Sequence, residues 1–285
     1  MSRFLTVVDP GPLTTVQDRG RPGWAHLGVP RSGALDQPSA ALANRLVGNP
    51  DHAAVLETTL GGVTLRVSTA MTVAVTGAEA AVTVDDRPVA VAEPVAARAG
   101  QTLRVGPARS GLRSYVAVAG GMDAREVLGS RSTDTLSGMG PAAVSAGDEI
   151  PVGEPVAAPH GIDVSVVRRL LPPVTLRFSP GPRADWFTER SLETLTGSAY
   201  AVSSDSNRVG LRLNGPGLTR RRREELPSEG LVLGAVQVPA SGEPLVFLND
   251  HPTTGGYPVI GVVLPDDLSA CAQLRPGDEV RFTLG

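Results

Sequence analysis

Short runs in which apolar and polar side chains alternate dominate this chain. This period of two is typical of strands that bury one face of a sheet. The first half carries the pattern at residues 71–76, 81–84, 89–91, 103–105 and 114–119. The second half carries it at residues 174–178, 245–248, 259–264 and 280–282. The pattern predicts a mainly β protein.

Helical signals are few and short. The clearest covers residues 38–47, where Asp36 can cap the first turn and Gly48 suits the position after the last turn. Leu42 and Leu46, four residues apart, would share the buried face of this helix. Weaker candidates follow at residues 185–195 and 267–274. We therefore expect a few short helices beside the strands.

A phrase of the form Gly-Asp-Glu-Ile/Val occurs twice, at residues 147–150 and 277–280. Such turns are common before strands, so the match could arise by chance; alternatively, two related β lobes each close with this turn and strand. Residues 151–160 between them have the Pro- and Gly-rich composition of a linker. We expect an N-terminal lobe at residues 1–159 and a C-terminal lobe at residues 160–285.

Composition excludes several classes of protein. The chain has 285 residues, enough to bury a core without disulfides or metals. All 26 positive residues are arginines, because the sequence contains no lysine. A Walker A loop, a Schiff-base enzyme and a covalent biotin carrier each need a lysine, so we expect none of these here. The net charge of −3 argues against a nucleic-acid partner.

Targeting and metal signals are weak. Cys271 is the single cysteine, which excludes an internal disulfide and is typical of a cytosolic protein. The first apolar run is too short for a signal peptide, and no stretch approaches the length of a membrane span. The four histidines lack the spacing of metal ligands. We expect a cytoplasmic protein with no membrane contact and no metal site.

The densest polar cluster between predicted buried strands covers residues 249–258. The adjacent glycines Gly255 and Gly256 let backbone N–H groups approach a ligand oxygen closely, as in an oxyanion hole or an anion nest. The alternative is a long turn in which Asp250 caps its own backbone. We favour a functional loop, because a carboxylate, an imidazole and two hydroxyls are more than a turn requires.

Two polar stretches near the amino terminus lack apolar periodicity; they cover residues 14–21 and 28–36. Long structureless connections inside compact domains are usually functional. Arg19, Arg21 and Arg31 could hold a carboxylate or a phosphate through forked hydrogen bonds. Alternatively, Asp18 and Asp36 pair with these arginines and only fix the loop.

A third polar cluster lies in the second half of the chain, at residues 203–213. Beyond it, Glu229 and Gln237 stand beside predicted strands, where uncompensated polar burial is unfavourable. They are either walls of a site or polar residues at strand ends. The arginine run at 220–223, followed by two glutamates, is typical of a solvated loop and otherwise could dock an acidic partner.

Six motifs occur in a fixed order and together resemble one family. They are PLTTVQDRGR at residues 12–21, SGALD at 32–36, NRLVGN at 44–49, VLGSRST at 127–133, NRVG at 207–210 and TTGGYP at 253–258. Over nearly its whole length the chain resembles the KipA family, also called allophanate hydrolase subunit 2 or the C component of 5-oxoprolinase. The same module forms part of the carboxyltransferase domain of biotin-dependent urea carboxylase. Leu35 and Asn249 depart from the residues usual in the family.

The resemblance implies two β-barrel-like lobes of cyclophilin-like character. It also implies one member of a 5-oxoprolinase complex that works with a KipI-type partner and a LamB/YcsF-type partner. The assembly opens the lactam of 5-oxo-L-proline to L-glutamate and uses ATP with Mg. The absence of lysine means that no P-loop in this chain binds the ATP and that no biotin is attached to it.

On this resemblance we assign expected roles to the polar residues. The expected catalytic residues are Asp250 and His251, which would orient water or nucleotide, and Gly255 and Gly256, whose amides would bind an oxyanion or phosphate. Arg19 or Arg31 would hold the substrate carboxylate. The other expected substrate-binding residues are Gln17, Asp36, Glu229, Thr254 and Tyr257.

Two other functions remain open at this point. The chain could be the carboxyltransferase component of a urea carboxylase or allophanate pathway, which would need a separate biotin carrier. It could also be a non-catalytic antagonist that binds a KipI-type kinase inhibitor. The sequence leaves open the true substrate, the stoichiometry, which member of the complex binds ATP, and whether the site lies within one lobe.

Overall fold

The computed structural model describes residues 2–159, 171–222 and 224–285. Contacts divide these residues into two compact units, which we describe separately. Unit 1 contains residues 2–21, 32–134 and 138–159, and unit 2 contains residues 22–31, 135–137 and the described residues from 171 onward. The lobe boundary at 159/160 stays a prediction, because His160 lies outside the described residues. Two short segments from the first half of the chain belong to unit 2.

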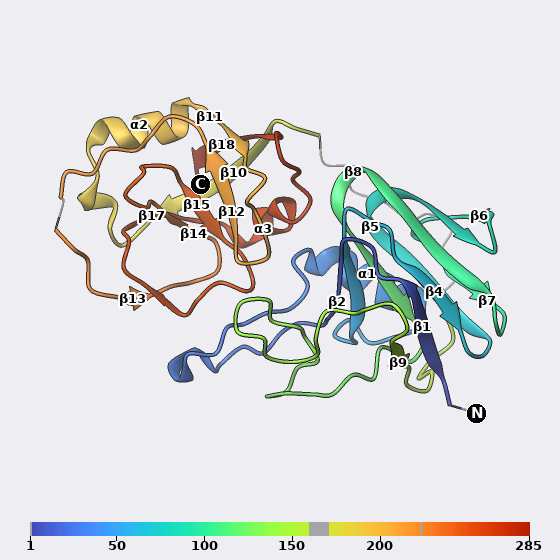
Figure 1. The fold of residues 1–285 in the computed structure, drawn as a ribbon. Helices are drawn as coiled ribbons and strands as arrows, with labels where there is room; N and C mark the ends of the chain where they lie inside the picture. Colours follow the sequence, from blue (N-terminus) through green and yellow to red (C-terminus); the bar gives the residue numbers. More distant parts are fainter. Residues whose placement is uncertain (1, 160–170, 223) are drawn as a thin grey trace. The chain divides into compact units, whose positions relative to one another are not determined.

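Unit 1 is built on a nine-stranded antiparallel sheet (Figure 1). Six strands lie side by side in the order β2-β3-β8-β4-β1-β9, and β5 pairs with β6, β7 and β8. The strands are β1 (Phe4–Asp9), β2 (Leu13–Gln17), β3 (Val55–Thr59), β4 (Thr64–Val67), β5 (Met71–Val84), β6 (Arg87–Val89), β7 (Val95–Ala97), β8 (Thr102–Val118) and β9 (Glu149–Pro151). Their alternating apolar side chains, among them Leu5, Leu56 and Leu65, form a buried core.

Strands β5 and β8 are longer than the sequence pattern predicts. They join the predicted strands 71–76 with 81–84, and 103–105 with 114–119. The register between β5 and β8 shifts next to Gly77 and Glu79. Gly77 has a φ of +91°, in the left-handed region that glycine adopts without strain. The predicted break is therefore a β-bulge, which bends a strand without ending it.

Helix α1 (Gln37–Leu46) confirms the clearest helical prediction and its caps. The Asp36 carboxylate accepts a hydrogen bond from the backbone N–H of Ser39 at 3.1 Å, which satisfies a donor of the first turn. Gly48 follows the helix with a φ of +79°. Leu46 is fully buried in a cluster with Tyr115 of β8, whereas Leu42 is only partly buried. The helix therefore packs on one face of the sheet.

Unit 2 contains a closed seven-stranded barrel in the order β10-β17-β14-β15-β12-β11-β18. The barrel closes through parallel pairing of β18 with β10. Its strands are β10 (Val174–Pro180), β11 (Ala199–Val202), β12 (Gly210–Asn214), β14 (Ala235–Gln237), β15 (Leu245–Phe247), β17 (Val259–Val263) and β18 (Glu279–Leu284). A two-stranded sheet, β13 (Glu229–Gly230) with β16 (Thr254–Gly255), accompanies the barrel.

Aromatic side chains fill part of the barrel. Phe282 of β18 meets Phe178 of β10 and Tyr200 of β11 edge to face, each at a centroid distance of 6.0 Å. Helices α2 (Glu189–Gly197) and α3 (Pro265–Cys271) correspond to the two weaker helical predictions. Short 3-10 turns η1 (Ala25–Leu27) and η2 (Ala184–Trp186) complete the helical elements of the described residues. The mainly β prediction with a few short helices is thus confirmed, and the sheet is closed into a barrel in unit 2.

The repeated Gly-Asp phrase forms a turn that is anchored on a neighbouring strand in unit 1. The Gly147 N–H donates to the carbonyl of Val7 in β1 at 2.8 Å, and the Val7 N–H donates to the carbonyl of Asp148 at 2.9 Å. The Asp148 carboxylate accepts from the N–H of Ser145 at 2.7 Å. The turn then leads into β9, which pairs antiparallel with β1.

The second copy of the phrase has the same contacts in unit 2. The Gly277 N–H donates to the carbonyl of Val202 in β11 at 2.8 Å, and the Val202 N–H donates to the carbonyl of Asp278 at 2.9 Å. The Asp278 carboxylate accepts from the N–H of Arg275 at 2.7 Å. Strand β18 follows and pairs antiparallel with β11. A shared hydrogen-bond pattern of this detail favours related lobes over a chance match.

None of the helices in the described residues has the length and hydropathy that a membrane span requires.

Gly77→Ala should destabilise the protein more than Gly147→Ala. The two glycines have nearly equal φ values, +91° and +90°, so the backbone strain of an alanine is matched at about 1 kcal/mol. A Cβ at Gly77 would lie 2.4 Å from the Arg113 carbonyl oxygen, whereas nothing lies within 4 Å at Gly147. We expect a further ~1–3 kcal/mol for this overlap. Unfolding in urea, followed by circular dichroism, measures the difference; equal midpoints for both variants would contradict it.

Candidate functional site

The connection between β15 and β17 is held at several points. The sequence predicts that the two apolar strands fix residues 249–258, and both strands are buried. Within the connection, β16 pairs antiparallel with β13, so that Gly255 lies opposite Glu229 and Thr254 lies opposite Gly230. The connection is thus an ordered loop with its own short β-ladder.

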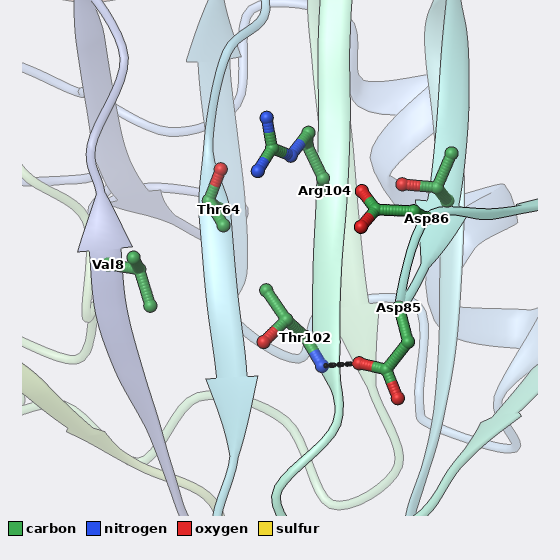
Figure 2. A pocket seen from close by; sticks show the side chains of 7 residues that line it. Val8, Thr64, Asp85, Asp86, Thr102 and Arg104 are labelled. Atoms are coloured by element: carbon green, nitrogen blue, oxygen red, sulfur yellow. Dashed lines mark hydrogen bonds between the residues drawn. The ribbon is translucent and has the colours of Figure 1, made fainter.

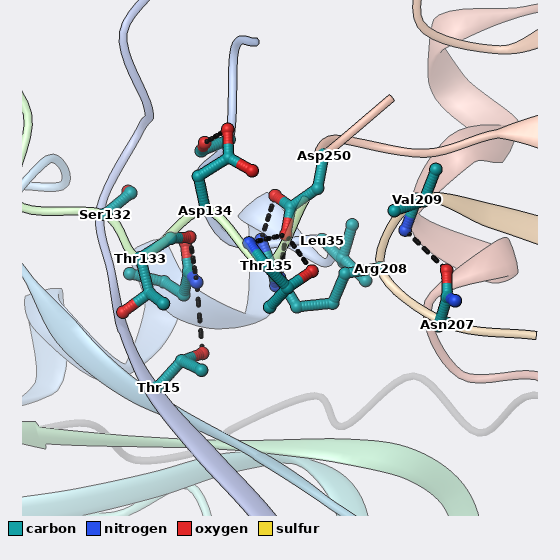
Figure 3. Close-up of polar contacts among 12 residues, drawn as sticks. Thr15, Leu35, Ser132, Thr133, Asp134, Thr135, Asn207, Arg208, Val209 and Asp250 are labelled. Atoms are coloured by element: carbon teal, nitrogen blue, oxygen red, sulfur yellow. Dashed lines mark hydrogen bonds and ion pairs between the residues drawn. The ribbon is translucent and has the colours of Figure 1, made fainter. Parts of the chain in front are cut away.

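Asp250 is fully buried and binds Arg208 (Figure 3). The Arg208 guanidinium donates through Nε to Asp250 Oδ2 at 2.9 Å and through Nη2 to Oδ1 at 3.0 Å. The backbone N–H of Asp250 also donates to the Arg208 carbonyl at 3.1 Å. This forked geometry is the strongest form of carboxylate recognition by arginine.

A third segment joins the same carboxylate. Thr135 donates its backbone N–H to Asp250 Oδ2 at 2.9 Å and its hydroxyl at 2.7 Å (Figure 3). Residues 135–137 belong to unit 2, although the chain on both sides of them belongs to unit 1. The Asp250 carboxylate therefore fastens this short excursion to the barrel.

Arg208 is placed by the NRVG motif. The Asn207 side-chain oxygen accepts from the N–H of Val209 at 2.8 Å, as Figure 3 shows, and from that of Gly210 at 3.3 Å. Such an Asx turn fixes the backbone that carries the neighbouring arginine. The motif that carried part of the resemblance thus positions the buried partner of Asp250.

His251 is buried next to Asp250. Its Nδ1 lies 2.6 Å from the Pro252 carbonyl, to which it donates, and its ring lies 5.8 Å from that of Phe247. Thr254, Gly256 and Tyr257, farther along the connection, are exposed. Of the predicted catalytic residues, Asp250 and His251 are therefore buried, Gly255 is partly buried and Gly256 is exposed.

Tyr257 belongs to a set of neighbouring residues that we name the Gln237 cluster: Arg220, Glu229, Gln237, Gly255 and Tyr257. Gln237 is buried and donates its side-chain amide to the Tyr257 carbonyl at 3.0 Å. A Cβ at Gly255 would lie 2.9 Å from the Gln237 amide nitrogen. The Arg220 guanidinium lies 5.4 Å from the centre of the Tyr257 ring. The cluster thus joins β14, β16 and the loop before β17.

Glu229 pairs with Arg183, which donates to it through Nε at 3.0 Å and through Nη2. These hydrogen bonds lower the pKa of the Glu229 carboxyl below its usual value of 4.5. Glu229 therefore stays ionised near neutral pH and does not act as a general acid there.

Other predicted residues lie in unit 1. Gln17 is fully buried and donates to the Thr15 hydroxyl and the Thr133 carbonyl, both at 3.0 Å, while its Oε1 has no partner among the described residues. Asp36 caps α1, and its N–H donates to the Tyr115 hydroxyl at 2.8 Å. Arg19 is exposed and lies 3.9 Å from Asp51.

The SGALD motif is held by a buried polar network. Glu57 accepts from the Leu35 N–H and from the Tyr115 hydroxyl, each at 2.9 Å. Burial and the nearby charges of Glu57 and Asp36 raise the pKa of Tyr115 well above its usual value. The hydroxyl therefore stays protonated; it donates to Glu57 and accepts from the Asp36 N–H of the loop.

Asp18 has a similar supporting function for the VLGSRST motif. Its carboxylate accepts from the hydroxyls of Ser130 and Ser132 and from the N–H of Arg131, each at 2.6 Å, and from the N–H of Gly20 at 2.7 Å. The sequence offered an ion pair with arginine side chains as the alternative for Asp18. These contacts show hydroxyl and backbone donors instead.

Arg31 is exposed and belongs to unit 2, whereas Gln17, Arg19 and Asp36 belong to unit 1. The structure brings together Glu229, Gly255 and Tyr257 from the predicted set. It adds Arg208 and Thr135, for which no role was predicted, and Arg220, whose run was predicted to be a solvated loop or to dock an acidic partner. Arg208 stood in a family motif and could have been found there; Arg220 stood in a run typical of solvated loops.

A pocket of about 310 Å³ opens on the sheet of unit 1 (Figure 2). It is lined by Val8, Thr64, Thr83, Asp85, Asp86, Thr102 and Arg104. Asp85 binds the Thr102 N–H at 2.8 Å and the Gln101 amide, which lowers the pKa of its carboxyl. None of the predicted site residues lines this pocket.

The chain is similar over nearly its whole length to known proteins. Residues 27–284 match the family described as carboxyltransferase domain, subdomain A and B. The chain is 40% identical to the C component of 5-oxoprolinase from Escherichia coli K12, over 98% of this chain and 90% of that protein.

Two solved structures have the same fold. The structure of TTHA0988 is 38% identical and superposes with a TM-score of 0.88; the match covers 99% of this chain and 56% of that one. The K. lactis urea amidolyase is 31% identical, with a TM-score of 0.92, and the match covers 100% of this chain and 19% of that one. In both, the matched region is one part of a longer chain.

Asp250→Asn should lower the free energy of unfolding by about 3–5 kcal/mol, because it leaves the Arg208 charge buried without a counterion. The double variant Arg208→Met with Asp250→Leu should lose less free energy of unfolding than the single variants Arg208→Met and Asp250→Leu lose in sum. Asp205→Asn is a matched control at an exposed site and should change stability by less than ~0.5 kcal/mol. Urea unfolding of these variants and the wild type measures the differences; a wild-type midpoint for Asp250→Asn would contradict the assignment.

Glu229→Gln should lower the melting temperature at pH 7 but not at low pH. The pKa of Glu229 is lower in the folded protein than its usual value of 4.5. Its stabilising contribution is therefore present above the unfolded pKa and is lost as the pH falls through the folded pKa. Scanning calorimetry of both proteins between pH 7 and pH 3 should show the melting curves converge; a constant difference would refute the ion pair as its cause.

Proposed function

We propose that this chain, which belongs to the family of carboxyltransferase domains with subdomains A and B, is the C component of a 5-oxoprolinase. The observation that carries the proposal is the 40% identity to the E. coli C component over nearly the full length of both chains. Such a component is one part of a multi-subunit hydrolase.

The proposed reaction opens the lactam of 5-oxo-L-proline to L-glutamate. Water adds its oxygen to the carbonyl carbon, the C–N bond breaks, and the nitrogen leaves as the amine of glutamate. Amide resonance, whose rotation barrier is roughly 18–20 kcal/mol, makes unassisted attack by water slow. A site for this reaction needs donors toward the carbonyl oxygen and a holder for the substrate.

ATP with Mg would supply the driving force by activating the carbonyl oxygen. The residues of this chain do not fit a nucleotide site of the P-loop kind. The chain has no lysine, and the described residues contain no group of three or more His, Cys, Asp or Glu side chains that could hold a metal. We therefore assign the binding of ATP to the assembly as a whole.

The buried and the exposed residues of the 249–258 connection have different roles in our proposal. Asp250 and His251 are buried and bound to Arg208, Thr135 and the Pro252 carbonyl. We infer that they hold the connection in place from the inside. The exposed Thr254, Gly256 and Tyr257 are the members that can meet a substrate.

We propose that the partners are a KipI-type protein and a LamB/YcsF-type protein, and that the assembly works in the cytoplasm. A second function, the carboxyltransferase component of a urea carboxylase, is favoured by the K. lactis superposition, which covers the whole chain. It would need a biotin carrier on another chain, because this one has no lysine to acylate.

Co-expression with both partners should give a complex that releases ADP in proportion to added 5-oxo-L-proline. Omitting this chain, or replacing 5-oxo-L-proline by urea, should abolish the release. Measurement of glutamate in the same sample checks that lactam opening accounts for the ADP. Turnover of urea with a biotinylated carrier, and none of 5-oxo-L-proline, would establish the second function instead.

A further inference from the structure

The position of Arg220 is fixed by contacts on both its backbone and its side chain. Its backbone forms a β-bridge with Phe187, and the next residue donates its N–H to the Trp186 carbonyl at 2.7 Å. Its Nη2 donates to the Val238 carbonyl, and its guanidinium lies over the ring of Tyr257. The guanidinium is therefore held against Val238 and Tyr257.

Two acidic side chains in this part of unit 2 are bound to other arginines. Glu229 pairs with Arg183 through two hydrogen bonds. Asp185 pairs with Arg222 at 3.2 Å. Within the part of the chain that the structure describes, no carboxylate lies in ion-pair contact with Arg220, and its buried Nε atom has no hydrogen-bond partner.

A partly desolvated cation without an anion is unfavourable, so such a group is expected where a ligand supplies the anion. The pKa of Arg220 is lowered, chiefly by burial, which agrees with this desolvation. The Val238 carbonyl uses one Nη2 donor, and the remaining terminal N–H donors of the planar guanidinium match the two oxygens of a carboxylate. The stacked ring of Tyr257 adds support without using these donors.

We propose that Arg220 binds the carboxylate of the substrate. Tyr257 fixes the position of the Arg220 guanidinium, and Gln237 fixes the position of Tyr257. The inference rests on the proposed function for the identity of that substrate. 5-Oxo-L-proline carries one carboxylate beside a neutral lactam, whereas urea has none. The arginine expected from the sequence for this role, Arg19 or Arg31, is exposed, so Arg220 replaces it in our proposal.

The test compares four proteins: wild type, Arg220→Gln, Arg220→Lys and Arg221→Gln. Arg221 is exposed and donates to the Asp185 carbonyl at 3.0 Å, so its variant removes the same charge from the next position. Calorimetric titration of the full chain, alone and in the assembly, uses three probes: 5-oxo-L-proline, its neutral analogue 2-pyrrolidinone, and acetate. Circular dichroism checks that each variant is folded.

We expect the wild type and Arg221→Gln to bind 5-oxo-L-proline and acetate but not 2-pyrrolidinone. Arg220→Gln should weaken binding of both carboxylates about 10- to 100-fold, which corresponds to loss of a charge-assisted hydrogen bond. Arg220→Lys keeps the charge without the fork and should lose less. In the assembly, the KM for 5-oxo-L-proline should rise in the same order.

The proposal is overturned if Arg220→Gln binds carboxylates like the wild type, if 2-pyrrolidinone binds as well as 5-oxo-L-proline, or if no carboxylate binds either the chain or the assembly. An assembly that hydrolyses 5-oxo-L-proline equally well with Arg220→Gln also overturns it, while the proposed function stands. If the chain binds acetate through Arg220 but the assembly never hydrolyses 5-oxo-L-proline, the proposed function is contradicted. The carboxylate subsite is then supported.

Discussion

The carboxylate of Asp250 is the point at which three separated segments of unit 2 meet. Arg208 binds it with a fork, and Thr135 adds a hydroxyl and an N–H. A charge removed this completely from water is tolerated only when its partners are held in good geometry. The strands and the Asx turn at Asn207 therefore have to form correctly for the Asp250 carboxylate to find its partners. The position of the exposed residues later in the connection depends on these contacts.

The strands and the main helix could be predicted because local patterns determine them. Alternation located the strands, and Asp36 with Gly48 marked the ends of α1. The continuity of β5 through Gly77 could not be read from the pattern, because a glycine in a strand signals a break and a bulge alike. Closure into a barrel also escapes local patterns, since it depends on the parallel pairing of β10 with β18, which lie far apart in the sequence.

The site was predictable only in part, because residue type does not reveal which partner a side chain finds. Asp250 was expected to orient water or nucleotide, yet its distant partners Arg208 and Thr135 surround it. Arg220 had the appearance of a solvated residue, yet its backbone bridge to Phe187 holds it on the Tyr257 ring. Motif order identified the family, but only three-dimensional contacts separate a supporting carboxylate from an accessible cation.

The short excursion at residues 135–137 has a consequence for anyone who wishes to dissect the molecule. Neither unit is encoded by one uninterrupted stretch, since residues 22–31 and 135–137 also belong to unit 2. A fragment that starts at residue 171 would contain every barrel strand but would lack Thr135, which donates two hydrogen bonds to the Asp250 carboxylate. A split of the gene between residues 137 and 171 would therefore remove two hydrogen bonds to the Asp250 carboxylate from the product that contains the barrel.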